Sequence, residues 1–117
     1  MDEFIKLAVI GSRDFPSQYL VERIIYELPA QLRLISGGAR GVDTWVELTA
    51  KHHNRWIDVY SANWSKHGKS AGFVRNNQII KNSDLVLAFW DGKSRGTKHS
   101  IQLAKYLGKS CIVVRAL

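Results

Sequence analysis

The sequence predicts an α/β fold: a Rossmann-like, three-layer arrangement around a five-stranded parallel sheet in the strand order 3-2-1-4-5. The first observation is that short apolar runs of strand composition alternate five times with segments of helical periodicity. The second is that the connections are short, which together with right-handed crossovers favours a sheet with helices on both faces. The third is that three strands run into loops rich in glycine, hydroxyl side chains and arginine, as at the ligand-binding edge of such sheets.

The expected strands end at turn residues and differ in how deeply they should be buried. Residues 85–90, LVLAFW, and the run that ends at Ile10 are continuously apolar, as in strands that are covered on both faces. Residues 56–60 alternate apolar and polar side chains, which predicts a more exposed or edge strand. The five expected strands are residues 5–10, 32–35, 56–60, 85–90 and 111–114.

Four helices are expected between these strands. Ser17 has the chemistry of an N-cap for the first helix, and Pro29 ends it. The second helix, residues 42–52, is amphipathic and carries Trp45 on its apolar stripe. The last helix ends before Gly108, a natural C′ residue. The expected helices begin at residues 17, 42, 70 and 97, and the polar segment 61–69 is expected to be a loop.

The composition is that of an ordinary globular protein with an excess of positive charge. The 117 residues are expected to form one domain over positions 1–117, since a 45% hydrophobic and 23% charged chain is not that of a disordered protein. The net charge of +7 and the isoelectric point near 9.8 imply affinity for anions in general. The basic residues do not form one run, which weakens the case for nucleic acid without removing it.

Several classes of protein are disfavoured by what the sequence lacks. No apolar run approaches the roughly 18 residues of a membrane-spanning helix, and the acidic start MDEFIK is wrong for a secretory signal. Cys111 is the single cysteine, so a cytoplasmic protein without internal disulfides or a membrane partner is expected. No metal site and no cofactor are expected, because no further His or Cys stands at a zinc-like interval from His52 and His53. A standard NAD dehydrogenase or P-loop NTPase is disfavoured because their glycine motifs are absent.

The three glycine-rich loops are expected to form an anion site at the carboxyl edge of the sheet. Backbone N–H groups at a helix start point at a ligand, and glycines let its oxygens approach. The first and fourth strands are neighbours in the predicted order, so their loops should meet. The loop residues expected to contact the ligand are Gly11, Ser12 and Arg13; Ser36, Gly37, Gly38, Arg40 and Gly41; and Gly92, Ser94, Arg95, Gly96 and Thr97.

Longer side chains complete the expected site. Arg13 and Arg75, the latter followed by Asn76, have the chemistry of phosphate forks, each able to form a charge-assisted bond of about 1.5–3 kcal/mol. The alternative for both arginines is a surface salt bridge worth about 0–1 kcal/mol. Trp64 or Trp90 is a candidate platform for a base, and buried packing is the alternative for Trp90.

Together these motifs resemble the SLOG superfamily of Rossmannoid proteins, and most closely its YspA-related branch. Its relatives include the LOG phosphoribohydrolases, which cleave the N-glycosidic bond of nucleoside monophosphates, and DNA-processing protein A, which binds single-stranded DNA. The resemblance implies a pocket for a nucleotide or a nucleotide-derived ligand. It covers nearly the whole chain and rests on residues 11–13 with Phe15, SGGARGVD at 36–43, Ala62 and Trp64 with Gly68-Lys69, Ala71-Gly72 with Arg75-Asn76, and residues 84–97.

Three functions are therefore weighed. The leading expectation is a domain that binds a nucleotide-like small molecule, in sensing or in N-glycosidic processing. The alternative is a single-stranded nucleic-acid-binding protein, which the net charge, Trp64 and the resemblance to DNA-processing protein A favour. The third is an assembly module in which the helix with Trp45 forms a homodimer face.

An enzymatic function stays open at this point. LOG enzymes carry a carboxylate three residues after the Thr of a Gly-Thr pair, where this chain has Ser100 after Thr97. A neutral hydroxyl does not stabilise the positive charge that develops on a ribose as its base departs. His99 could protonate a leaving base, and Asp43 or Asp91 could supply the missing charge. We expect binding of nucleoside monophosphates without hydrolysis at a LOG-like rate; an active protein would be a phosphoribohydrolase.

Overall fold

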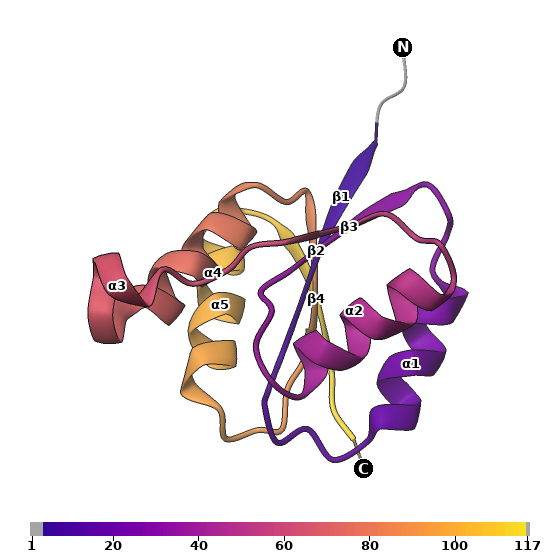
Figure 1. The fold of residues 1–117 in the computed structure, drawn as a ribbon, viewed down its shortest axis with the longest axis horizontal. Helices are drawn as coiled ribbons and strands as arrows, with labels where there is room; N and C mark the ends of the chain where they lie inside the picture. The colour runs from indigo at the N-terminus through magenta and orange to yellow at the C-terminus, as the bar shows by residue number, and fades with distance from the viewer. Residues whose placement is uncertain (1–3, 117) are drawn as a thin grey trace.

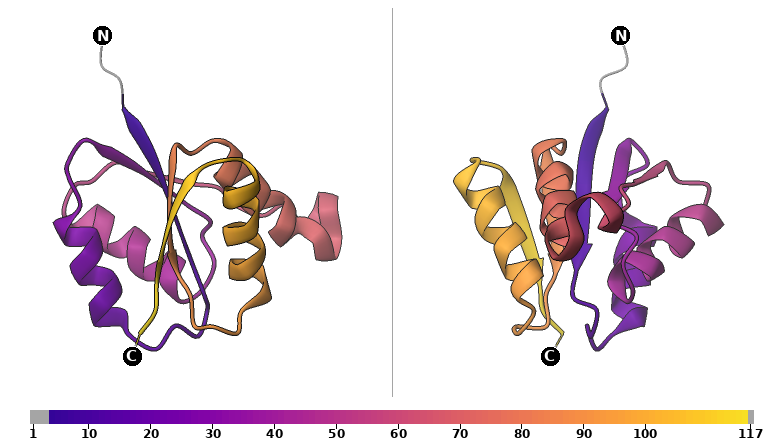
Figure 2. Two further views of the ribbon diagram at one scale, coloured as in Figure 1. Left: turned by 180° about the vertical axis from the view of Figure 1, so that it is seen from behind. Right: turned by 60° about the vertical axis from the view of Figure 1, so that its left-hand side comes forward.

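The computed structural model describes residues 4–116 and contains a five-stranded sheet between two pairs of helices (Figures 1 and 2). The strand order is β3-β2-β1-β4-β5, and every neighbouring pair is parallel. The predicted fold class and strand order are therefore confirmed. The elements are β1 (Ile5–Gly11), α1 (Gln18–Glu27), β2 (Leu32–Ser36), α2 (Val42–His52), β3 (Ile57–Val59), α3 (Trp64–His67), the 3₁₀ turn η1 (Gly68–Ser70), α4 (Ala71–Lys81), β4 (Leu85–Phe89), α5 (Arg95–Tyr106) and β5 (Ser110–Val114).

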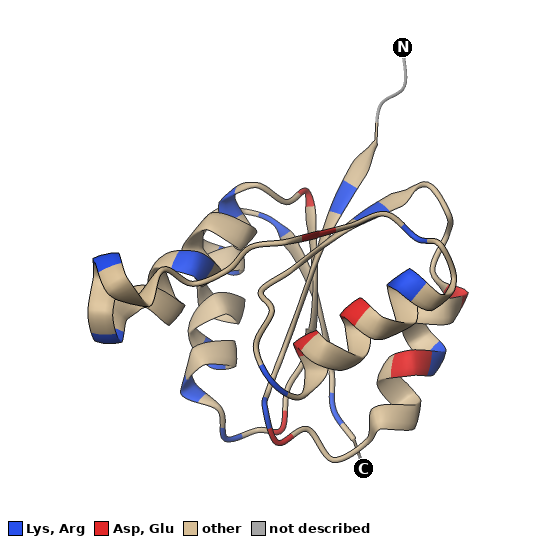
Figure 3. Ribbon diagram, viewed as in Figure 1, with Lys and Arg blue, Asp and Glu red and all other residues tan. Residues whose placement is uncertain are grey.

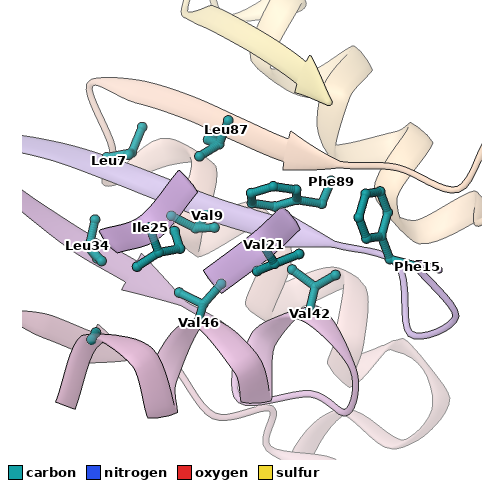
Figure 4. Packing of buried hydrophobic residues seen from close by; sticks show 11 residues of the cluster. Leu7, Val9, Phe15, Val21, Ile25, Leu34, Val42, Val46, Leu87 and Phe89 are labelled. Carbon is teal, nitrogen blue, oxygen red and sulfur yellow. The ribbon is translucent and has the colours of Figure 1, made fainter. Parts of the chain in front are cut away.

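Two apolar cores lie on opposite faces of the sheet, because successive side chains of a strand point to opposite sides. Leu7 and Val9 of β1 belong to the core beneath α1 and α2 (Figure 4). Ala8 and Ile10 of the same strand belong to the second core, beneath α4 and α5. Each core needs both of its helices to exclude water, so the continuous apolar runs in β1 and β4 follow from burial on two faces.

The start of α5 differs from the sequence prediction. The helix begins at Arg95, and Ser94 is its N-cap, whose Oγ accepts the Thr97 N–H at 3.3 Å. Thr97 thus lies in the first turn instead of opening the helix. The physical reason is the side chain of Asp91, which accepts the N–H groups of Lys93 and Ser94, each at 2.8 Å, and so turns the chain into the helix two residues early.

The segment that was expected to be a loop contains the short helix α3 and the turn η1. Asn63 caps α3 by accepting the Lys66 N–H at 3.1 Å. Four residues are too few for helical periodicity to appear in a sequence. Figure 1 shows α3 to one side of the sheet, next to the start of α4. The third strand is confirmed as an edge strand, although it spans only Ile57–Val59.

Three smaller expectations have clear outcomes. Ser17 is the N-cap of α1, accepting the Leu20 N–H at 3.1 Å. Gly108 follows α5 with a φ of 72°, as a C′ glycine does. Trp45 is partly buried against the core beneath α1 and α2, so packing accounts for it and the homodimer face stays a prediction.

The last strand is more exposed than its apolar sequence suggests. In β5, 66% of Ile112 is accessible to solvent, because β5 is an edge strand and α1 and α2 cover the sheet nearer to β1. None of the helices between residues 4 and 116 combines the length and the apolar character that crossing a bilayer requires.

The end of β1 lies against the first turn of α2. A Cβ atom at Gly11 would overlap the side chain of Val42, which is fully buried. The glycine therefore sets how closely β1 and α2 approach, and with it where the loop after β1 leaves the sheet.

Replacement of Gly11 by Ala should lower the free energy of unfolding by about 1–3 kcal/mol, since the added methyl overpacks this contact. The measurement is urea unfolding at equilibrium. Gly96→Ala is the matched control: a Cβ at Gly96 meets no atom within 4 Å, so this change should be neutral or stabilise by about 0.4–1 kcal/mol. Equal stabilities of the two variants would contradict the assigned contact.

Candidate ligand-binding cleft

A cleft of about 820 Å³ opens at the carboxyl edge of the sheet, between the loops after β1 and β4 and the helices α4 and α5. Its volume lies in the usual range for small-ligand sites. The predicted site residues that line it are Gly11, Arg13, Asp43, Arg75, Asn76, Asp91, Ser94, Gly96 and Thr97. Residues from four separate parts of the sequence are thus brought together.

A second and smaller hollow of about 300 Å³ adjoins the cleft on the side of β2 and β3. We call it the side hollow. It shares Arg13, Ala39 and Arg75 with the cleft, so these three residues form the boundary between the two spaces. Its remaining lining residues are Gly37, Gly38, Arg40, Ser61, Ala62 and Trp64.

Two glycines of the loop after β2 let the arginines approach. A Cβ at Gly41 would overlap the backbone of Arg13, and Gly41 has a φ of 76°, which side chains rarely adopt. A Cβ at Gly37 would stand 2.9 Å from Cδ of Arg75 and 3.0 Å from Oδ2 of Asp43. The loops after β1 and β2 are therefore packed against each other and against α4 at positions where a side chain would meet neighbouring atoms at 3.0 Å or less.

Arg75 is fixed by hydrogen bonds within the protein. Its Nη1 donates to the Gly37 carbonyl at 2.6 Å, and its Nε donates to Oδ1 of Asn76 at 2.9 Å. Burial lowers its pKa; the nearby carboxylate of Asp43 opposes that effect, whereas the positive charge of Arg13 adds to it. A bound anion would offset both the desolvation and the repulsion between the two arginines.

Asp43 lies in the first turn of α2, just below the loop after β2. Burial raises the pKa of its carboxyl to about 6, although the Ala39 N–H, which its Oδ2 accepts at 3.1 Å, and the charge of Arg75 act in the opposite direction. Asp43 as a whole residue is only 7% exposed. The main role of Asp43 is therefore to hold the loop after β2 and the side chain of Arg75 in place.

A buried hydroxyl network joins the loops after β1 and β4. Ser12 Oγ accepts the Asp91 N–H at 3.1 Å and lies 3.3 Å from the hydroxyl of Thr97. Burial raises the pKa of Asp91, but the N–H groups of Ser94 and Lys93 outweigh burial and hold that pKa below its ordinary value. Asp91 is thus an ionised turn residue, and Ser12 has a structural role beneath the cleft.

Positive charge dominates the side hollow more than the cleft. The cleft is lined by Arg13, Lys69, Arg75 and Lys93, but also by three aspartates. The side hollow is lined by three arginines and by no carboxylate. Figure 3 shows basic residues in the loops that follow β1 and β4 and on α3. An anion is therefore more favoured at the three arginines of the side hollow than in the rest of the cleft, and two of these arginines, Arg13 and Arg75, also line the cleft.

Some residues of the predicted site do not line the cleft. Gly92 is packed against Arg115, and Arg95 is exposed at the start of α5 without lining the cleft. Ser36 is fully buried at the end of β2. His99 is exposed and makes an edge-to-face contact with Phe73, with ring centroids 5.3 Å apart. Helical periodicity explains this, because Thr97, Ser100, Ile101 and Ala104 form the buried face of α5.

Among the lining residues that are absent from the predicted site, Lys69, Phe73 and Lys93 add positive charge or an aromatic ring to the cleft. The position of Lys93 directly after Gly92, in a loop expected to bind an anion, was a signal in the sequence that Lys93 could line the site. Lys69 of η1 and Phe73 in the first turn of α4 line the cleft because these two elements border it. In the sequence, Lys69 stood out only within the motifs that carry the resemblance. Within residues 4–116, no three His, Cys, Asp or Glu side chains come together as a metal site would require.

The chain is a Rossmann-like α/β protein with a cleft at the carboxyl edge of its sheet that several basic residues line, and two solved structures share this fold. DNA processing protein A from Streptococcus pneumoniae superposes with a TM-score of 0.85 at 19% identity, over 97% of this chain and 51% of that one. DNA processing protein A from Helicobacter pylori, studied for its binding of single-stranded DNA, superposes with a TM-score of 0.78 at 24% identity, over 97% of this chain and 66% of that one. The chain thus spans about half to two thirds of these neighbours. The resemblance to DNA-processing protein A is confirmed at the level of the fold.

The chain belongs to the same family as the Gene 61 protein of Mycobacterium phage D29. The two are 33% identical over 90 residues, which cover 72% of each chain. No family model matches the sequence. The YspA-related branch and the relationship to LOG enzymes stay predictions.

Asp43 should make the stability of the protein depend on pH between about 4 and 6. The carboxyl has a pKa of 3.8 in the unfolded chain and about 6 in the fold, so in this range the folded state keeps a proton that the unfolded state has released. The free energy of unfolding should therefore fall as pH rises, by up to about 3 kcal/mol.

Asp43→Asn has no such proton, so its stability relative to the parent protein should increase with pH over the same range. Urea unfolding of both proteins at several pH values measures the difference. A difference that stays constant from pH 4 to 7 would show that Asp43 is not the titrating group.

Proposed function

We propose that the protein binds single-stranded nucleic acid, with a backbone phosphate held between Arg13 and Arg75. The observation that carries this proposal is the pair of arginines at the boundary of the cleft and the side hollow. Two like charges close to each other, one of them partly buried, are unfavourable without an anion. A phosphodiester supplies that anion, and guanidinium groups match its oxygens in geometry.

The overall charge and the shared fold support this choice. A net charge of +7 attracts a polyanion over the whole surface. DNA processing protein A of Helicobacter pylori binds single-stranded DNA and has the same fold. The cleft and the side hollow adjoin each other at Arg13, Ala39 and Arg75, so one continuous strand could contact both.

A free nucleoside phosphate is a second candidate, favoured by the volume of the cleft. The arrangement of side chains gives little support to a catalytic role of His99, Asp43 or Asp91 in cleaving a glycosidic bond. Asp43 and Asp91 accept backbone N–H groups, and His99 does not line the cleft. We therefore infer that any nucleotide in the cleft is bound without hydrolysis of its glycosidic bond.

Arg13→Ala should weaken binding of a fluorescent oligo-deoxythymidine by about tenfold or more, because a charge-assisted contact to phosphate is lost. Anisotropy titrations at several salt concentrations should also show a salt dependence that is shallower by about 0.7 in the slope of log K against log salt, the value for one phosphate contact of a single strand. Arg13 is exposed, so the substitution should leave the fold intact.

Arg23→Ala serves as the control, since Arg23 is an exposed arginine of α1 that pairs with Glu27 at 2.9 Å, away from the cleft. If Arg13→Ala binds the oligonucleotide as the parent does, the phosphate site is misplaced. Binding that does not respond to salt would favour the free nucleotide over the strand.

A further inference from the structure

We propose that the site binds a dinucleotide unit: one nucleoside in the cleft, the next in the side hollow with its base on Trp64, and the linking phosphate on Arg13 and Arg75. This inference rests on the proposed function. It specifies which parts of a bound strand the cleft, the side hollow and the two arginines contact. It follows from the arrangement of the two spaces, which are separate hollows that share one boundary.

Two guanidinium groups at the boundary have the chemistry of a phosphate site, and a third arginine, Arg40, lines the side hollow. Arg13 and Arg75 both line the cleft and the side hollow, so a group bound to them adjoins both spaces. A mononucleotide has one nucleoside and fills one space. A phosphodiester has a nucleoside on either side, which is the geometry that these two hollows present.

The side hollow has the features of a stacking platform. Trp64 lines it and is 56% exposed, although a large apolar side chain is costly to leave in water. Arg40 lies on the same hollow, and an arginine beside an aromatic ring adds a second flat surface for a base. Stacking on such surfaces tolerates any base, because every base has an aromatic face.

Trp64 is held where a base could reach it. Its Cη2 atom lies 3.9 Å from the position of a Cβ at Gly72, which is an ordinary van der Waals distance, so the ring lies close to the first turn of α4. Ser61 and Ala62, which precede α3, close the hollow on the other side with small side chains. Small residues around an exposed ring leave space for a planar ligand.

The test compares two ligands, thymidine 5′-monophosphate and 5′-phosphorylated dithymidine, by isothermal titration calorimetry. The parent protein should bind the dinucleotide more tightly than the mononucleotide. Trp64→Ala should remove this difference by weakening the dinucleotide at least about fivefold, while leaving the mononucleotide unchanged. Trp64→Phe keeps an aromatic ring and should retain most of the preference.

Trp56→Ala is the matched control, because Trp56 is 54% exposed but lies at the opposite end of the sheet, beside Arg33. It should bind both ligands as the parent does. If Trp64→Ala weakens both ligands equally, or neither, while Arg13→Ala weakens both, the dinucleotide arrangement is wrong and the phosphate site stands. If Arg13→Ala changes neither ligand, the proposed function itself fails.

Discussion

The close packing of the loops after β1 and β2 is the contact on which the candidate site depends. Gly41 lies against the backbone of Arg13, and Gly37 lies against the side chains of Arg75 and Asp43. Parallel strands bring these loops to one edge, but only the absence of side chains allows them to touch. The two arginines are consequently held near each other by the backbone, before any ligand arrives, which lowers the entropy that binding must overcome.

The same packing explains why a buried carboxylate is kept in a site for anions. Asp43 accepts the Ala39 N–H and lies near Arg75. Without it, the desolvated guanidinium would have no opposite charge close by in the empty site. The carboxylate thus compensates for Arg75 while the cleft is empty, at the cost of a weaker net attraction for phosphate.

The fold could be predicted from the sequence because its strands are buried on both faces. An apolar run such as residues 85–90, which turn residues and segments of helical periodicity flank, can hardly form anything other than a buried strand. The loops at the carboxyl edge were predicted for the same reason, since strand order fixes which loops meet. The predicted residues Gly11, Arg13 and Thr97 accordingly line one cleft.

What could not be predicted depends on contacts between distant parts of the chain. The start of α5 is set by the side chain of Asp91, whose hydrogen bonds outweigh the signal at Thr97. Lys69 and Phe73 line the cleft because of how η1 and α4 meet it, which no local pattern encodes. His99 is the opposite case: it was a candidate acid in the sequence, but Thr97, Ser100, Ile101 and Ala104 form the buried stripe of α5, and helical periodicity then places His99 on the outer face.

The position of α3 separates what the site recognises from what keeps the protein folded. Trp64 belongs to a short helix with no fully buried residue, which packs beside α4 and η1. The arginine boundary, by contrast, is built into the contact between two core loops. If Trp64 contacts a base as proposed, mutations in segment 61–70 should alter ligand preference with little loss of stability, whereas side chains at Gly11, Gly37 or Gly41 would meet neighbouring atoms at 3.0 Å or less. Divergence of specificity among relatives should accordingly concentrate in this one segment, with the phosphate-binding scaffold inherited intact.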